Sequence, residues 1–441
     1  MTVWEAAAQR LPPTRTPTPA RKGQEVKRDF RWYLLGQTTS AAGSALTTVA
    51  LPYLAVHQLA ASTGRTGALA AAPPVVMLLF GFPLAGWLDR RPRKRRWLVR
   101  ADLLACAALF AAAAALATNR LTLSTLTLLA AVLGACGLVV EAGYFAHLRT
   151  LVPGEALIRA RGWLQGGEQV GKLLGRAVFG LVIAGLGATA PFICDAASFA
   201  VSAVCLLAIR TPDRPARPAR EPARTSDDQL PEGPAPGTGR AWWPTDPALR
   251  RLLPAVLAGA AGSGAISALL APYLLRDLAV PGSWYGMVFV LAGGTGLVGS
   301  ALGVRLTRRL PPLSLAVAGL LGVALTAALL PLAAGPWWLA TVLVSASMAG
   351  QACCGAVSNI GLTGYVTVVV PEAQLGRAGV SLQILGAVGQ IAGALGAGLL
   401  ASSTGATPVL WLAVALGAAG PLWLLSPRTR VAPIPDSAGR P

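Results

Sequence analysis

Twelve apolar stretches, each about long enough to cross a lipid bilayer, dominate the 441-residue sequence. A bilayer crossing needs about 20 mostly apolar residues. Only 12% of the residues are charged, about half the share usual in soluble proteins. These features predict an all-α integral membrane protein and exclude an ordinary soluble enzyme and a disordered chain. The predicted spans are 32–57, 67–88, 97–118, 123–147, 164–187, 191–209, 250–275, 284–304, 312–334, 338–366, 378–402 and 406–425.

Basic residues outnumber acidic ones by 37 to 18, an excess that often indicates nucleic-acid binding. Their distribution points elsewhere. If both termini lie inside, 32 of the 37 fall in inside segments and only Arg65, Arg120 and Arg276 fall in outside loops. This bias follows the positive-inside rule. It predicts a multi-pass plasma-membrane protein with both termini cytoplasmic, and it excludes a nucleic-acid partner.

A polar stretch rich in Pro and Arg divides the spans into six and six. It contains too few apolar residues to bury a core, so it is interpreted as a flexible cytoplasmic linker. The predicted organisation is an N-terminal tail (1–31), a six-helix bundle (32–209), the linker (210–249), a second six-helix bundle (250–425) and a C-terminal tail (426–441).

The two halves resemble each other. The segment from Val152 to Gln165 matches the segment from Val370 to Gln383 at seven of fourteen positions, at a constant offset of 218. The same offset aligns the basic loops after the second and eighth spans, and a Pro-Tyr-Leu triplet recurs in the first and seventh. A parallel repeat of six-span units is typical of the major facilitator superfamily. We therefore expect two pseudo-symmetric bundles.

The loop from Gly86 to Arg96 resembles the loop signature of that superfamily, although Ala85 and Pro92 stand where the signature has glycine. The resemblance implies that Asp89, Arg90 and Arg93 are gating residues, which hold one state through cytoplasmic charge contacts. The alternative is a solvated basic loop that only fixes topology.

Parts of the first and sixth spans resemble the drug:proton antiporter, macrolide-efflux-like branch. They are Gly36-Gln37 with Ser40, and Phe192-x-x-Asp195-x-x-Ser198-Phe199. The resemblance covers residues 29 to 426. It implies proton-coupled efflux of hydrophobic drug-like or natural-product molecules, as in multidrug resistance, by alternating access. The family's antiporter motif has Pro where this chain has Arg176, which puts antiport itself in question.

Charged residues at membrane depth indicate a cavity or an ion path. Glu168, Lys172 and Arg176 lie four residues apart, on one helix face. With Glu141, about seven residues from the inner end of its span, they are candidates for proton coupling. Glu141 is the predicted proton carrier. The alternatives are structural: Glu141 paired with Lys172, Glu168 paired along the helix with Lys172, and Arg176 paired with a carboxylate on the fourth span.

Two further acids are interpreted as structural. Asp102 lies near the inner surface, and Asp195 is placed in the first turn of its helix, where the N-terminus favours an acid. The amides Gln37, Asn359, Gln383 and Gln390 are candidates for the substrate cavity. Charge on one side and amides or apolar groups on the other suit an amphiphilic, cationic organic molecule.

No cofactor, metal or nucleotide is expected. The stretch from Gly166 to Lys172 resembles the start of a P-loop, but Leu173 takes the Ser/Thr position. The expected partners are a small organic substrate, protons and the lipid bilayer, with the protein acting as a monomer. Two alternatives remain open: export of another metabolite, such as a siderophore or an amino acid, and a non-transporting membrane sensor or assembly partner.

Overall fold

The computed structural model of the chain describes residues 19–89, 94–151, 154–209, 247–370 and 372–426. Within these ranges every regular element is a helix, and no β-strand occurs. Apolar runs become helices because each peptide N–H and C=O then finds its partner within its own segment, as a lipid environment requires. The predicted all-α membrane fold is confirmed.

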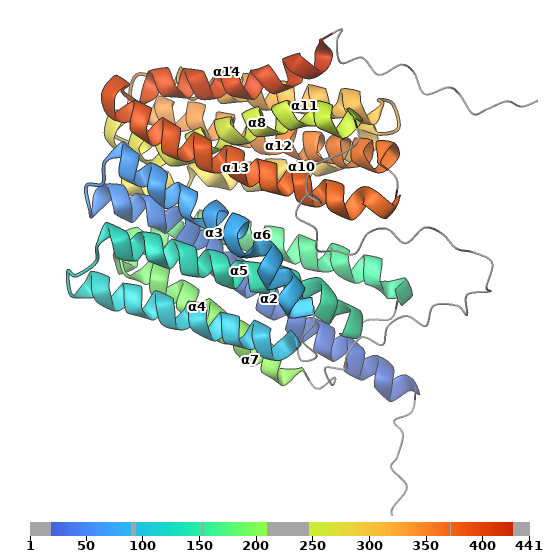
Figure 1. Ribbon diagram of the computed structural model, residues 1–441. Coiled ribbons are helices and arrows are strands. Elements are labelled where there is room, and N and C mark those ends of the chain that lie inside the picture. The colour runs from blue at the N-terminus through green and yellow to red at the C-terminus, as the bar shows by residue number, and fades with distance from the viewer. Residues whose placement is uncertain (1–18, 90–93, 152–153, 210–246, 371, 427–441) are drawn as a thin grey trace, which may run out of the picture.

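Six long helices form a first bundle, drawn in blue to green in Figure 1. They are α2 (Pro19–His57), α3 (Thr63–Asp89), α4 (Lys94–Ala117), α5 (Leu123–Leu151), α6 (Gly154–Leu186) and α7 (Ala190–Ala208).

The second bundle, yellow-green to red in Figure 1, contains the remaining helices. They are α8 (Pro247–Pro272) extended by the π-turn η1 (Tyr273–Asp277), α9 (Gly282–Tyr285) with α10 (Val288–Leu306), α11 (Pro312–Ala327), α12 (Trp337–Val369), α13 (Glu372–Thr404) and α14 (Ala406–Leu425). Across the described residues, eleven segments are long and apolar enough to cross a membrane, and α11 is a shorter apolar helix. The span predicted at 312–334 is therefore too long. Pro331 has no N–H to donate to the carbonyl of Ala327, four residues earlier, and its ring would clash with that carbonyl, so α11 ends at Ala327.

Several segments predicted to be polar are partly helical. α2 begins at Pro19, inside the predicted N-terminal tail, and α5 and α6 extend to Leu151 and Gly154, where a longer cytoplasmic segment was expected. Most of the predicted linker, 210–246, and nearly all of the C-terminal tail, 427–441, lie outside the described residues.

The two bundles repeat one packing pattern. In the first, α2 packs on α6 and α7, α3 packs on α5, and α4 packs on α5 and α7. In the second, α8 packs on α13 and α14, α10 packs on α12, and α11 packs on α12 and α14. Each helix thus has the neighbours of its counterpart six spans earlier, which confirms two pseudo-symmetric bundles.

Two glycine pairs show this symmetry at the level of single residues. A Cβ on Gly175 of α6 would overlap the carbonyl oxygen of Ala42 in α2, and a Cβ on Gly393 of α13 would overlap that of Ala261 in α8. Gly171 and Gly389, one turn earlier, meet the same partner helices. Both pairs are separated by the offset of 218 found in the sequence. Small residues allow helix backbones to approach closely in membranes.

Candidate functional site

A cavity of about 580 Å³ lies between the two bundles. Helices α2, α3, α5, α6 and α7 of the first bundle supply most of its wall, and α8, α9 and α10 of the second supply the rest. Its polar lining residues are Gln37, Ser40, Ser44, Thr47, Thr48, Thr66, Glu168, Lys172, Arg176, Asp195, Ser267 and Tyr285. The remaining lining residues are apolar or glycine, so the site is suited to an amphiphilic molecule.

All three charged residues predicted on the fifth span face this cavity. Lys172 Nζ donates to Glu168 Oε1 at 2.5 Å, and both side chains are a little more than one-third exposed. The pairing along the helix, one of the sequence alternatives, is thus present. Arg176 also lines the cavity, but it makes no hydrogen bond or ion pair with any described residue.

Glu141 has a different environment. It lies on α5 with an exposed side chain and has no ion-pair partner in the described part of the chain. Its neighbours Val140 and Gly137 line the cavity, whereas Glu141 does not. Lys172, its proposed partner in the structural alternative, is bonded to Glu168 instead.

Only one of the four amide residues predicted for the substrate cavity lines it. Gln37 lines the cavity, but Asn359, Gln383 and Gln390 do not, although their side chains are exposed. Asn359 instead accepts a long hydrogen bond from Thr363, at 3.5 Å, within α12. The polar lining therefore comes mainly from the first bundle.

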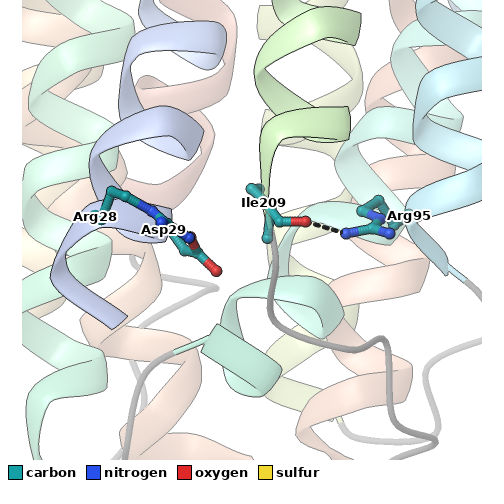
Figure 2. A network of polar contacts seen from close by, with 4 residues as sticks. All are labelled: Arg28, Asp29, Arg95 and Ile209. Atoms are coloured by element: carbon teal, nitrogen blue, oxygen red, sulfur yellow. Dashed lines mark hydrogen bonds and ion pairs between the residues drawn. The ribbon is translucent and has the colours of Figure 1, made fainter. Parts of the chain in front are cut away.

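The predicted gating residues lie at, or just beyond, the end of a described segment of the chain. Asp89 ends α3, its side chain is not described, and Arg90 and Arg93 fall outside the described residues. The next part of the same loop carries a contact that sequence reasoning missed. Arg95 donates to the carbonyl oxygen of Ile209 at 2.5 Å, which ties the start of α4 to the end of α7 (Figure 2).

Figure 2 also shows Arg28 and Asp29, near the start of α2. Arg28 Nη2 lies 2.9 Å from Asp29 Oδ1, and the Asp29 side chain is almost completely buried. Sequence reasoning placed both residues in a polar tail. A buried acid at this position could not be anticipated from a segment rich in Lys and Arg.

Asp195 and Asp102 are both buried, and neither forms an ion pair within the described chain. Asp195 Oδ1 accepts from Ser198 Oγ at 3.1 Å, and Gly43 of α2 leaves room for both side chains. The predicted position of Asp195 is wrong, because the first turn of α7 contains no acidic residue. Asp195 instead lines the cavity at the point where α7 packs on Gly43 of α2.

Aromatic residues from both bundles gather at one end of the cavity. The ring of Tyr53 lies 5.4 Å from Phe179 and 5.9 Å from Tyr285, and Tyr285 lies 5.5 Å from Phe289. Edge-to-face and tilted pairs at these distances stabilise the contact beyond simple burial.

Further contacts between the bundles lie at the same end of the molecule. Arg276 donates to the carbonyl oxygen of Ala61 at 2.7 Å, and Gly67 of α3 packs directly on Ala394 of α13. This end is opposite the start of α2 and the end of α14 (Figure 1). The cavity is therefore closed on the side remote from the described chain ends.

Solved structures with this arrangement are membrane transporters. The nucleoside transporter NupG matches with a TM-score of 0.68 and 15% identity, over 90% of this chain and 99% of that one. A bacterial homologue of the iron transporter ferroportin, in an inward-facing state, matches with a TM-score of 0.67 and 15% identity, over 90% and 97% of the two chains. A bacterial homologue of the human lysosomal transporter Spinster, also inward-facing, matches with a TM-score of 0.62 and 16% identity, over 95% and 100%. At these identities the likeness shows the fold alone.

No curated protein sequence matches the chain. The sequence model of the Major Facilitator Superfamily matches residues 33–360, well over half of the sequence. With two six-helix bundles around a central cavity, the chain belongs to the Major Facilitator Superfamily and is a multi-pass membrane transporter.

Proposed function

We propose that this transporter exports amphiphilic organic molecules by alternating access, driven by the proton gradient. The observation that carries the proposal is the cavity between the bundles, which is largely apolar, closed at one end and bordered by an ion pair on α6. Binding at the interface of two bundles couples occupancy to their relative movement, because the wall on each side belongs to a different body.

The Glu168–Lys172 pair supports proton coupling. Glu168 reaches the cavity and holds a cation through a charge that disappears on protonation. A protonated Glu168 would release Lys172 and change the charge that the substrate meets. Glu141 is the second candidate carrier, exposed on α5 but outside the cavity lining.

The distribution of basic residues supports cytoplasmic termini. The closed end of the cavity then faces outward, and the structure corresponds to a state closed to the outside. To test this orientation, the six native cysteines are replaced by alanine and a single Cys is introduced as Ser226→Cys, in the linker. An impermeant thiol reagent should leave Ser226→Cys unlabelled in intact cells and label it after lysis.

The control for orientation is Arg120→Cys, in the exposed turn between α4 and α5, which should react in intact cells. Labelling of the linker variant without lysis, with the turn variant protected, would reverse the proposed orientation.

The loop after α3 provides a test of gating. If Asp89 holds the cytoplasmic gate, Asp89→Asn should reduce transport by roughly tenfold, the effect of about 1.4 kcal/mol on the rate-limiting barrier. Its protein level should be unchanged. The comparison is Arg91→Gln, which removes one charge from the same basic run. Equal, mild effects from both would favour a loop that only fixes topology.

The overall function is tested by accumulation of an amphiphilic dye in cells expressing the protein. Expression should lower the accumulated dye, and a protonophore should abolish the difference. Lower accumulation that survives the protonophore would indicate a driving force other than the proton gradient. No difference with any amphiphile would favour a non-transporting role. If the protein instead exports another metabolite, such as a siderophore or an amino acid, its expression should lower the accumulation of that compound but not of the dye.

A further inference from the structure

Arg176 is a permanent cation inside the cavity with no anion to balance it. Arg176 lines the cavity, and its side chain makes no hydrogen bond or ion pair with the described residues. Of the acids nearby, Glu168 is bonded to Lys172, and Asp195 is fully buried and accepts from Ser198. Arginine keeps its charge in proteins, so neutralisation by loss of a proton is not an alternative.

The repeat shows that the fold does not need a cation at this position. The offset that relates Gly175 to Gly393 makes Ala394 the counterpart of Arg176, and Ala394 is a residue of α13 that is buried where α13 packs on α3. An uncharged small residue therefore satisfies the same helix position in the second bundle. Charged residues that face a cavity at membrane depth mark substrate or ion pathways, so an arginine with no partner among the described residues indicates a ligand that balances it.

The position of Arg176 also links it to the bundle interface. A Cβ on Gly286 would lie 3.0 Å from the carbonyl oxygen of Arg176, so α6 and the second bundle meet at this residue. The apolar residues Phe199 and Phe289 line the same cavity, as do Leu69 and Leu133. A ligand with one anionic group and an aromatic or aliphatic body would contact both kinds of surface.

We infer that Arg176 binds the anionic group of an organic amphiphile, a carboxylate, sulfonate or phosphate, whose apolar part fills the cavity. The inference rests on the proposed transport function and differs from the cationic substrate expected from the sequence. The planar guanidinium can hold two oxygens of such a group at once, an arrangement that a lysine cannot reproduce.

Two matched fluorescent probes test the inference. Anilinonaphthalene sulfonate carries an anionic group, and N-phenyl-naphthylamine is the same ring system without it. Each is titrated against purified protein in phosphatidylcholine nanodiscs, with the signal of protein-free nanodiscs subtracted. Wild type should bind the sulfonate more tightly than the neutral probe, on the order of tenfold or more.

Variants test whether the tighter binding of the sulfonate depends on Arg176. Arg176→Gln should bind both probes equally, and Arg176→Lys should keep part of the preference. Arg65→Gln, at an exposed position at the start of α3, should behave as wild type. Repeating the titration with phosphatidylglycerol in the nanodiscs identifies the source of the anion: competition by that lipid would show that a headgroup can occupy the same site.

The outcomes are distinguishable. Equal binding of both probes by wild type, or a preference that survives Arg176→Gln, would overturn the anion site and leave export of amphiphiles intact. Failure of wild type to bind the sulfonate, the neutral probe and the cationic dye ethidium would overturn both proposals. If Arg176→Gln does not fold, the comparison of the two probes on wild type and on Arg176→Lys still decides.

Discussion

Replacing Gly175 with valine is expected to remove most of the folded protein from the membrane. The backbone of α2 already occupies the space that a Cβ would take, at the carbonyl oxygen of Ala42. Backbone cannot move aside as the end of a side chain can, so the cost should be about 3 kcal/mol or more, at the upper end of overpacking effects. Gly393→Val should have an equal effect through Ala261 in the second bundle.

The chain contains matched controls for both variants. A Cβ on Gly166 of α6 or on Gly396 of α13 meets no atom within 4 Å. Valine at these positions should leave the amount and thermal stability of purified protein near the wild-type values. Equal yields and melting temperatures for Gly175→Val and Gly166→Val would show that the close α2–α6 contact is not needed for the fold.

Glu168→Gln is expected to abolish proton-driven accumulation in proteoliposomes, a fall of at least about tenfold to the background rate. Glutamine imitates the protonated carboxyl permanently, so the charge on Lys172 is no longer switched by the gradient. Substrate exchange down its own gradient should persist, because the cavity lining is otherwise unchanged. The measurement compares dye uptake with and without an imposed pH gradient.

Two further variants separate coupling from structure. Glu141→Gln should retain proton-driven uptake if Glu168 carries the proton. The reverse result, with Glu141→Gln inactive and Glu168→Gln coupled, would assign the carrier role to Glu141. If Glu168→Gln lowers protein yield because Lys172 loses its partner, Glu168→Gln with Lys172→Met should restore the yield but not the coupling.

The membrane fold was predictable because hydropathy and charge act over whole segments. A run of some twenty apolar residues has few alternatives to a spanning helix, and the offset of 218 predicts two related bundles from matched residues alone. The i, i+4 spacing also predicted the Glu168–Lys172 pair as one possibility, since a helix places such residues on one face.

Other features depend on partners that a sequence does not identify. Arg95 bonds a backbone carbonyl more than a hundred residues away, and any carbonyl in the chain could have been its acceptor. Glu141 and Val140 are adjacent in sequence, yet only Val140 reaches the cavity, because the direction of each side chain depends on how α5 is rotated. Helix ends were imprecise for a related reason: the helices continue beyond the apolar segments that define the spans.

The paired glycines Gly171/Gly389 and Gly175/Gly393 have a consequence for how such a protein can diversify. The two bundles share the contacts that hold α6 on α2 and α13 on α8, while the residue directly after the first glycine is Lys172 in one bundle and Gln390 in the other. On α6, each packing glycine is therefore followed directly by a charged residue that lines the cavity: Lys172 follows Gly171, and Arg176 follows Gly175. The first bundle can therefore carry charges toward a cargo, while the equivalent positions of the second bundle, Gln390 and Ala394, stay uncharged and the glycine contacts that hold the helices together are the same in both.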